Sequence, residues 1–94
     1  MQDFDNSIFV GDKPFMNYVT GIVMQFTTKE AHTVVVKARG KYITRAVDVA
    51  LVAAAKFLAD KVVVDGVKID SEEIQNKDGK DVRVSIIEIT LRRV

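Results

Sequence analysis

Residues 33–50 read TVVVKARGKYITRAVDVA and contain three successive structural signals. Residues 33–38 are dense in β-branched side chains, which is typical of a buried strand. Gly40 lets the backbone turn tightly because it has no side chain. From Ile43 onward, apolar residues recur at three- and four-residue steps, which predicts an amphipathic helix over residues 43–58. The stretch therefore predicts a strand, a glycine turn and a helix in direct succession.

The sequence before this stretch predicts another strand and helix. Residues 7–10 form a short apolar run that ends at Gly11, which favours a first strand. Pro14 suits the first turn of a helix, where its missing N–H costs nothing. Apolar residues then recur at helical spacing to about residue 27.

The sequence after this stretch predicts a hairpin. Residues 61–70 are rich in valine and favour a third strand, and residues 82–94 alternate apolar and polar side chains as a fourth strand would. The dipeptide Asp-Gly at positions 78–79 is a hairpin-turn signal. Both strands are long, so we expect them to project as an arm.

The resulting order, β-α-β-α-β-β, predicts an α+β fold in a single domain spanning residues 1–94. Because βα crossovers are right-handed, both helices should lie on one face of a four-stranded mixed sheet. A chain of 94 residues buries only about 60–65% of its unfolded surface, so a partner subunit would add stability.

The composition excludes several classes of protein. The chain has no cysteine, which rules out disulfides, thiolate catalysis and sulfur-ligated metals. Its longest apolar run, VALVAAA from Val49, is far shorter than the roughly 20 residues that cross a bilayer. Its N-terminal residues are acidic and polar, unlike a signal peptide. We therefore expect a soluble cytoplasmic protein with no membrane contact.

Side chains suited to catalysis or metal binding are few and scattered. His32 is the only histidine and lies in a polar connection, and no Walker loop, dinucleotide-binding or zinc-binding motif is present. In the acidic cluster of residues 70–81, Asp70 and Glu72 would share one face of a strand while Glu73 points to the other. We therefore predict that the protein is not an enzyme and holds no metal and no cofactor.

Positive charge is concentrated in the middle of the chain. Residues 21–57 carry six basic and two acidic side chains, a net charge of +4, although the whole chain carries only +1. Lys37 and Arg39 alternate at a strand end, so both can point to one side. Lys41 and Arg45 are four residues apart at a helix start, where the helix N-terminus also attracts phosphate. These residues indicate either a phosphate-binding surface or a solvated basic patch.

Four blocks of this sequence occur in an order known from one protein family: GDKPFMNYV (residues 11–19), VVKARGKYITRAVDVA (35–50), KFLADK (56–61) and RVSIIEI (83–89). In all four, the chain resembles the Alba family of archaeal chromatin proteins. The resemblance implies a fold like that of the C-terminal domain of translation initiation factor 3. It also implies a dimer, formed with a second copy or with another Alba-like protein, that binds double-stranded DNA without sequence preference and in many members RNA. Chromosome compaction and a nucleoid location follow from the same resemblance.

The resemblance and the basic pattern together predict a set of nucleic-acid-binding residues. Those in the body of the domain are Lys13, Asn17, Tyr18, Lys37, Arg39, Gly40, Lys41 and Arg45. Tyr18 could equally contact nucleic acid or pack. Phe57 matches an aromatic at which family dimers meet each other on DNA, and it is also the last apolar residue of the helix stripe.

The sequence departs from the family pattern in its charges. Asp12 replaces one of two basic residues that commonly follow the first glycine, at the position where lysine acetylation tunes binding in the family. Residues 70–81, at the end of the hairpin arm, contain two lysines and five acids, a net charge of −3. Only Lys77, Lys80 and Arg83 could meet phosphates there. We therefore expect weaker or more salt-sensitive binding, and the alternative role is a protein-interaction subunit of an RNA-processing or chromatin assembly.

Overall fold

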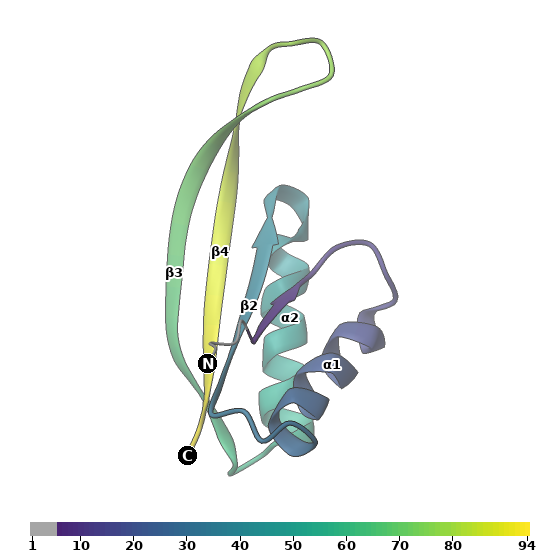
Figure 1. Ribbon diagram of the computed structural model, residues 1–94, viewed down its shortest axis with the longest axis vertical. Coiled ribbons are helices and arrows are strands. Elements are labelled where there is room, and N and C mark those ends of the chain that lie inside the picture. The colour runs from purple at the N-terminus through teal and green to yellow at the C-terminus, as the bar shows by residue number, and fades with distance from the viewer. Residues whose placement is uncertain (1–5) are drawn as a thin grey trace.

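A computed structural model describes residues 6–94, and its order of elements is the predicted one (Figure 1). The two principal helices and four strands are β1 (Ser7–Phe9), α1 (Phe15–Thr27), β2 (Thr33–Arg39), α2 (Ile43–Val52), β3 (Val62–Gln75) and β4 (Asp81–Arg93). A 3₁₀ turn, Gly40–Tyr42, leads into α2, and a short π-helix, Ala53–Phe57, continues it.

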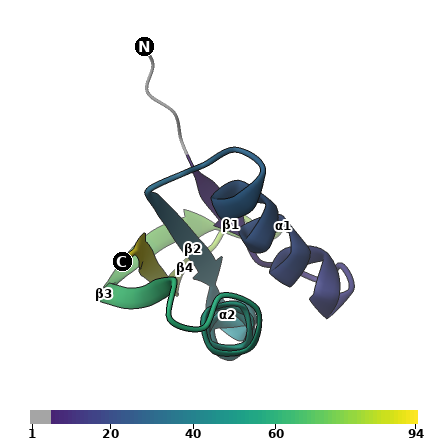
Figure 2. The ribbon, with the colours of Figure 1, turned by 90° about the horizontal axis from the view of Figure 1, so that it is seen from below.

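The four strands form one mixed sheet in the order β1-β2-β4-β3. β1 pairs with β2 in parallel, whereas β4 pairs with β2 and with β3 in antiparallel fashion. Both helices cover the same face of this sheet, as right-handed crossovers require (Figure 2). In the part of the chain that the structure describes, the opposite face carries no helix, and it is called the open face below.

The hydrophobic core lies between the helices and the sheet. It is built from alternate residues of the strands and from one stripe of each helix, as the periodicities of strand and helix predict. Its central members are Val19, Ile22 and Phe26 of α1, Val34, Val36 and Ala38 of β2, Ala46, Val49 and Ala50 of α2, and Ile87, Ile89 and Leu91 of β4. The alternate strand residues, including Lys37 and Arg39, consequently project from the open face.

The hairpin arm projects beyond the body, as predicted, but its first strand is longer than the sequence indicated (Figure 1). β3 continues to Gln75 instead of ending near residue 70, because its acidic residues pair in register with β4. The turn is therefore confined to residues 76–80. In it, the Asn76 side-chain oxygen accepts hydrogen bonds from the backbone N–H groups of Asp78 at 2.9 Å and Lys80 at 3.0 Å.

The second helix also differs in one detail from the regular helix that the sequence predicts. At its end, the Leu58 N–H donates to the Ala53 carbonyl at 3.0 Å, which is the wider π-helical spacing. The alanine run places small side chains here, and Ala53 and Ala54 are buried. Phe57 closes this turn with 51% of its surface exposed.

Residues 6–94 contain neither a membrane-spanning helix nor a cluster of metal-ligating side chains. None of the helices there is long and apolar enough to span a membrane. The same residues include no cluster of three or more potential metal-ligating side chains.

Candidate nucleic-acid interface

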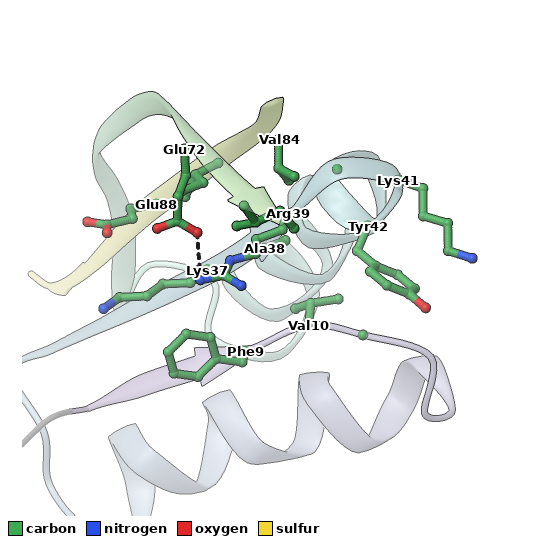
Figure 3. Close-up of a pocket in the computed structure, with 14 residues that line it drawn as sticks. Phe9, Val10, Lys37, Ala38, Arg39, Lys41, Tyr42, Glu72, Val84 and Glu88 are labelled. Atoms are coloured by element: carbon green, nitrogen blue, oxygen red, sulfur yellow. Dashed lines mark ion pairs between the residues drawn. The ribbon is translucent and has the colours of Figure 1, made fainter. Parts of the chain in front are cut away.

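A hollow of about 700 Å³ lies on the open face, at the end of the sheet where β2 runs into the loop of residues 39–42, called the central loop below. Residues from all four strands line it, because side chains that are neighbours across a pair of strands point to the same face. Phe9 is opposite Lys37, which is in turn opposite Glu88, and Arg39 is opposite Ile86. Figure 3 shows these charged and aromatic side chains gathered around the hollow.

The central loop, residues 39–42, forms one rim of the hollow. Gly40 has a φ of +53°, in the left-handed region that other residues avoid, so the turn into α2 depends on glycine. Lys41 is exposed, and its Nζ lies 5.4 Å from the ring centroid of Tyr42. Among residues 6–94, no side chain caps the N-terminus of α2. Its first turn contains no acidic residue, so the helix start remains suited to an anion.

The loop between β1 and α1 is held beside this central loop by two side chains. The Tyr18 hydroxyl accepts hydrogen bonds from the backbone N–H groups of Gly11 and Lys13, each at 3.0 Å. Arg45, in the first turn of α2, donates from Nη1 to the Gly11 carbonyl, and its guanidinium lies 5.6 Å from the Tyr18 ring centroid. Tyr18 and Arg45 therefore position the loop that carries Lys13, whose side chain is exposed.

Two acidic residues lie among the cations of the open face. Arg39 Nη2 is 2.9 Å from Glu72 Oε1, which joins the central loop to the hairpin arm. Lys37 Nζ lies 5.4 Å from the Phe9 ring centroid, and Glu88 stands opposite Lys37 on β4. The hollow is thus rimmed by both signs of charge, with Lys41 farther toward the loop.

The remaining predicted residues lie apart from the hollow. Lys77 and Lys80 are exposed at the tip of the arm. Arg83 is on the arm as well, where Nη1 donates to Ser71 Oγ at 3.2 Å and Nη2 lies 3.6 Å from Glu73 Oε2. Asn17 is exposed in the first turn of α1, next to the loop that carries Lys13.

Sequence reasoning missed four residues of this surface: Phe9, Tyr42, Glu72 and Glu88. A signal for Phe9 existed, because Ile8 packs against the core and its strand neighbour must then point to the open face. The pairing of Glu72 with Arg39 had no local signal, since it depends on the register of two strands that are distant in the sequence.

The sequence profile of the Alba family matches residues 6–71. The chain belongs to the Alba family. It is similar to the DNA/RNA-binding protein Alba of Methanocella arvoryzae, with 49% identity over 89 residues that cover 95% of this chain and 91% of that protein. It is also similar to the DNA/RNA-binding protein Alba of Nanoarchaeum equitans, with 51% identity over 85 residues that cover 89% and 93% of the two chains.

A solved structure of an Alba-family protein shares this fold. Alba from Thermoplasma volcanium superimposes with a TM-score of 0.84 at 46% sequence identity, covering 93% of this chain and 99% of that one. The match confirms the predicted α+β fold of two helices on a four-stranded mixed sheet. Because the relatives are named as DNA/RNA-binding proteins, membership of this family also confirms the prediction that the chain is not an enzyme.

Proposed function

We propose that this Alba-family protein binds double-stranded DNA and RNA through their backbone phosphates, without sequence preference. The observation that carries the proposal is the convergence of two loops at one end of the sheet. Tyr18 and Arg45 hold the loop of Lys13 against the start of α2, beside the exposed side chains of Arg39 and Lys41. Long exposed cations that surround a helix N-terminus recognise phosphate without reading a base.

A dimer would double this surface. On the helix-bearing side of the sheet, Val67 and Ile69 of the edge strand β3 are 59% and 76% exposed, and Leu51 of α2 is 51% exposed. An exposed apolar edge strand is suited to pairing with a second copy of the chain, and a domain this small gains stability from a partner. We propose that the partner is a second copy or another Alba-like protein.

The affinity of the dimer for nucleic acid would fall as the salt concentration rises. Lys13, Lys37, Arg39 and Lys41 of each subunit supply the candidate phosphate contacts. If about six of the eight side chains engage phosphates, the slope of log K against log salt is about −5. The acidic arm, in which only Lys77, Lys80 and Arg83 can reach phosphates, makes binding weaker than a uniformly basic arm would.

Coating of DNA would follow from contacts between dimers. Phe57 is half-exposed at the end of the π-helical turn, where it could meet the same residue of a neighbouring dimer on DNA. Repeated contacts of this kind would compact the chromosome. The proposed location is therefore the cytoplasm, in association with the nucleoid.

A salt-titrated binding assay with duplex DNA, duplex RNA and single strands tests the proposal. The variant Arg39→Ala with Lys41→Ala should bind duplex DNA at least about tenfold more weakly, because it removes four cations from the dimer surface. The matched control, Lys29→Ala with Lys61→Ala, removes the same charge from exposed positions outside the two loops and should bind almost as the wild type does. Equal affinities of the two double variants would contradict the assignment.

The acidic arm favours a second candidate function. A subunit of an RNA-processing or chromatin assembly would need protein contacts rather than strong nucleic-acid affinity, and the ion pair of Arg39 with Glu72 lowers the free positive charge of the loop. The two functions are distinguished by the same assay. Absence of binding to all three ligands at low salt would favour the assembly subunit.

A further inference from the structure

Phe9 is a large aromatic side chain exposed on the open face of the sheet. It is the last residue of β1, and 67% of its surface is accessible. Single exposed apolar residues are common and need no explanation. Phe9 differs because it stands at the edge of the hollow, with the Lys37 ammonium 5.4 Å from its ring centroid.

The hollow beside Phe9 has an apolar floor and a charged rim. Val84 and Ile86 of β4 and Ile74 of β3 supply aliphatic surface, and the cations are at the end where β2 meets the central loop. A volume of about 700 Å³ lies within the range of sites that accept a small planar ligand. Glu72 and Glu88 border the same space, so an uncharged group fits its interior better than a phosphate does (Figure 3).

We propose that this hollow receives an unpaired nucleobase, which stacks on the Phe9 ring while the phosphates beside it contact Arg39 and Lys41. The inference rests on the proposed function, because the same loop holds the backbone. Aromatic rings that flank a basic surface bind single strands by stacking, and they tolerate any base because every base has a π-face. Bases in a duplex are already stacked and paired, so they cannot enter without being flipped out.

The Phe9 site therefore distinguishes duplex from single-stranded nucleic acid, which the phosphate contacts alone do not. The affinity for duplex DNA should depend on the two loops and not on Phe9. The affinity for single-stranded RNA, or for an unpaired loop of a folded RNA, should depend on both. This gives the protein a means of holding unpaired RNA on a surface that also binds duplex backbone.

Fluorescence anisotropy with a labelled single-stranded RNA of about 15 nucleotides and a DNA duplex of equal length tests the inference. Phe9→Ala should weaken single-strand binding by about fivefold or more and leave duplex binding within about twofold. Phe9→Tyr keeps the ring and should retain single-strand affinity. Met24→Ala, which removes another half-exposed apolar side chain from α1, is the matched control and should change neither affinity.

A second measurement uses the unaltered protein. RNA that carries 5-iodouridine should form a photo-crosslink to the peptide that contains Phe9, which mass spectrometry can locate. Crosslinks confined to the loop of Arg39 and Lys41 would overturn the inference. Unchanged single-strand affinity of Phe9→Ala, or an equal loss for both ligands, would overturn it as well.

The outcomes also distinguish failure of the inference from failure of the proposed function. If duplex binding is lost in the Arg39→Ala, Lys41→Ala variant while Phe9→Ala has no effect on RNA, the proposed function stands and the base site is wrong. If the wild-type protein binds neither ligand at low salt, both are wrong.

Discussion

The Arg39 guanidinium and the Glu72 carboxylate form an ion pair between the central loop and the hairpin arm, with Nη2 and Oε1 2.9 Å apart. Their side chains are 62% and 40% exposed, so the pair is accessible to solvent and to ligands. A bound phosphate must compete with Glu72 for the arginine. The arm of this protein therefore weakens the cationic loop that it lies beside.

Glu72→Gln should raise the affinity for duplex DNA by about 1.4- to fivefold, which corresponds to the roughly 0.2–1 kcal/mol typical of an exposed ion pair. The gain should shrink as salt is raised, because screening already weakens the pair. Salt-titrated anisotropy measures both effects. Glu30→Gln, which removes an exposed carboxylate from the connection between α1 and β2, is the control with equal charge. A gain of equal size in both variants would show that only net charge matters.

Tyr18→Phe should loosen the loop that carries Lys13. The substitution removes the oxygen that accepts hydrogen bonds from the Gly11 and Lys13 N–H groups and should lower the free energy of unfolding by about 1 kcal/mol. Duplex affinity should fall severalfold, although every cation is retained. Tyr42→Phe removes a neighbouring hydroxyl and serves as the control. Urea unfolding and anisotropy report the two effects, and unchanged affinity would show that the loop needs no such anchor.

Alanine should have opposite effects at two glycines. Gly40 has a φ of +53°, which a residue with a Cβ adopts only at a cost, so Gly40→Ala should destabilise the fold by about 1–2 kcal/mol. A Cβ there would lie 3.8 Å from Val84 Cγ1, an ordinary contact, so the cost comes from the backbone and not from a clash. Gly21 lies inside α1, and Gly21→Ala should stabilise by about 0.4–1 kcal/mol. A Cβ at Gly21 would be 3.5 Å from Ile8 Cδ1, which is normal contact. Thermal or urea unfolding measures both, and equal signs would contradict the backbone explanation.

Ile69→Lys should convert the proposed dimer to a monomer. Ile69 is 76% exposed on the helix-bearing side of the edge strand, and a lysine there would place like charges together in a symmetric interface. Light scattering coupled to size-exclusion chromatography measures the mass. Ile74→Lys, on the arm and on the other face of β3, is the matched control and should remain dimeric. Two dimeric variants would place the interface elsewhere.

Arg93→Ala should destabilise the fold, because Arg93 joins the last strand to the end of α1. Its guanidinium donates to the Phe26 carbonyl and to the Ala31 carbonyl, the latter at 3.1 Å from Nη2 and 3.3 Å from Nε. Loss of these bonds should lower the free energy of unfolding by about 1–3 kcal/mol. Arg92→Ala removes an exposed ion pair with Asp65 and should cost at most about 1 kcal/mol. Equal losses of unfolding free energy for the two variants, measured by urea unfolding, would show that the bonds from Arg93 to the carbonyl groups add no stability.

The sequence predicted the elements and the core because both depend on near neighbours along the chain. Alternation in β2 assigns Val34 and Val36 to one face and Lys37 to the other, and helical spacing assigns Val19 and Ile22 to the core. The extent of β3 was underestimated, since its acidic end has no strand signal of its own. Only pairing with β4 makes that end a strand.

The candidate site was predictable in its residue types and not in their arrangement. Residue order alone indicated that Lys37, Arg39, Gly40 and Lys41 belong to one basic loop. Only the tertiary structure decided that Arg45 donates a hydrogen bond to the Gly11 carbonyl. It also decided that Glu72 forms an ion pair with Arg39 and that Phe9 lines the hollow. These contacts join segments that the sequence keeps far apart. They depend on the register of the sheet and on how α2 packs against it. No local pattern specifies the register, because many registers share the same alternation.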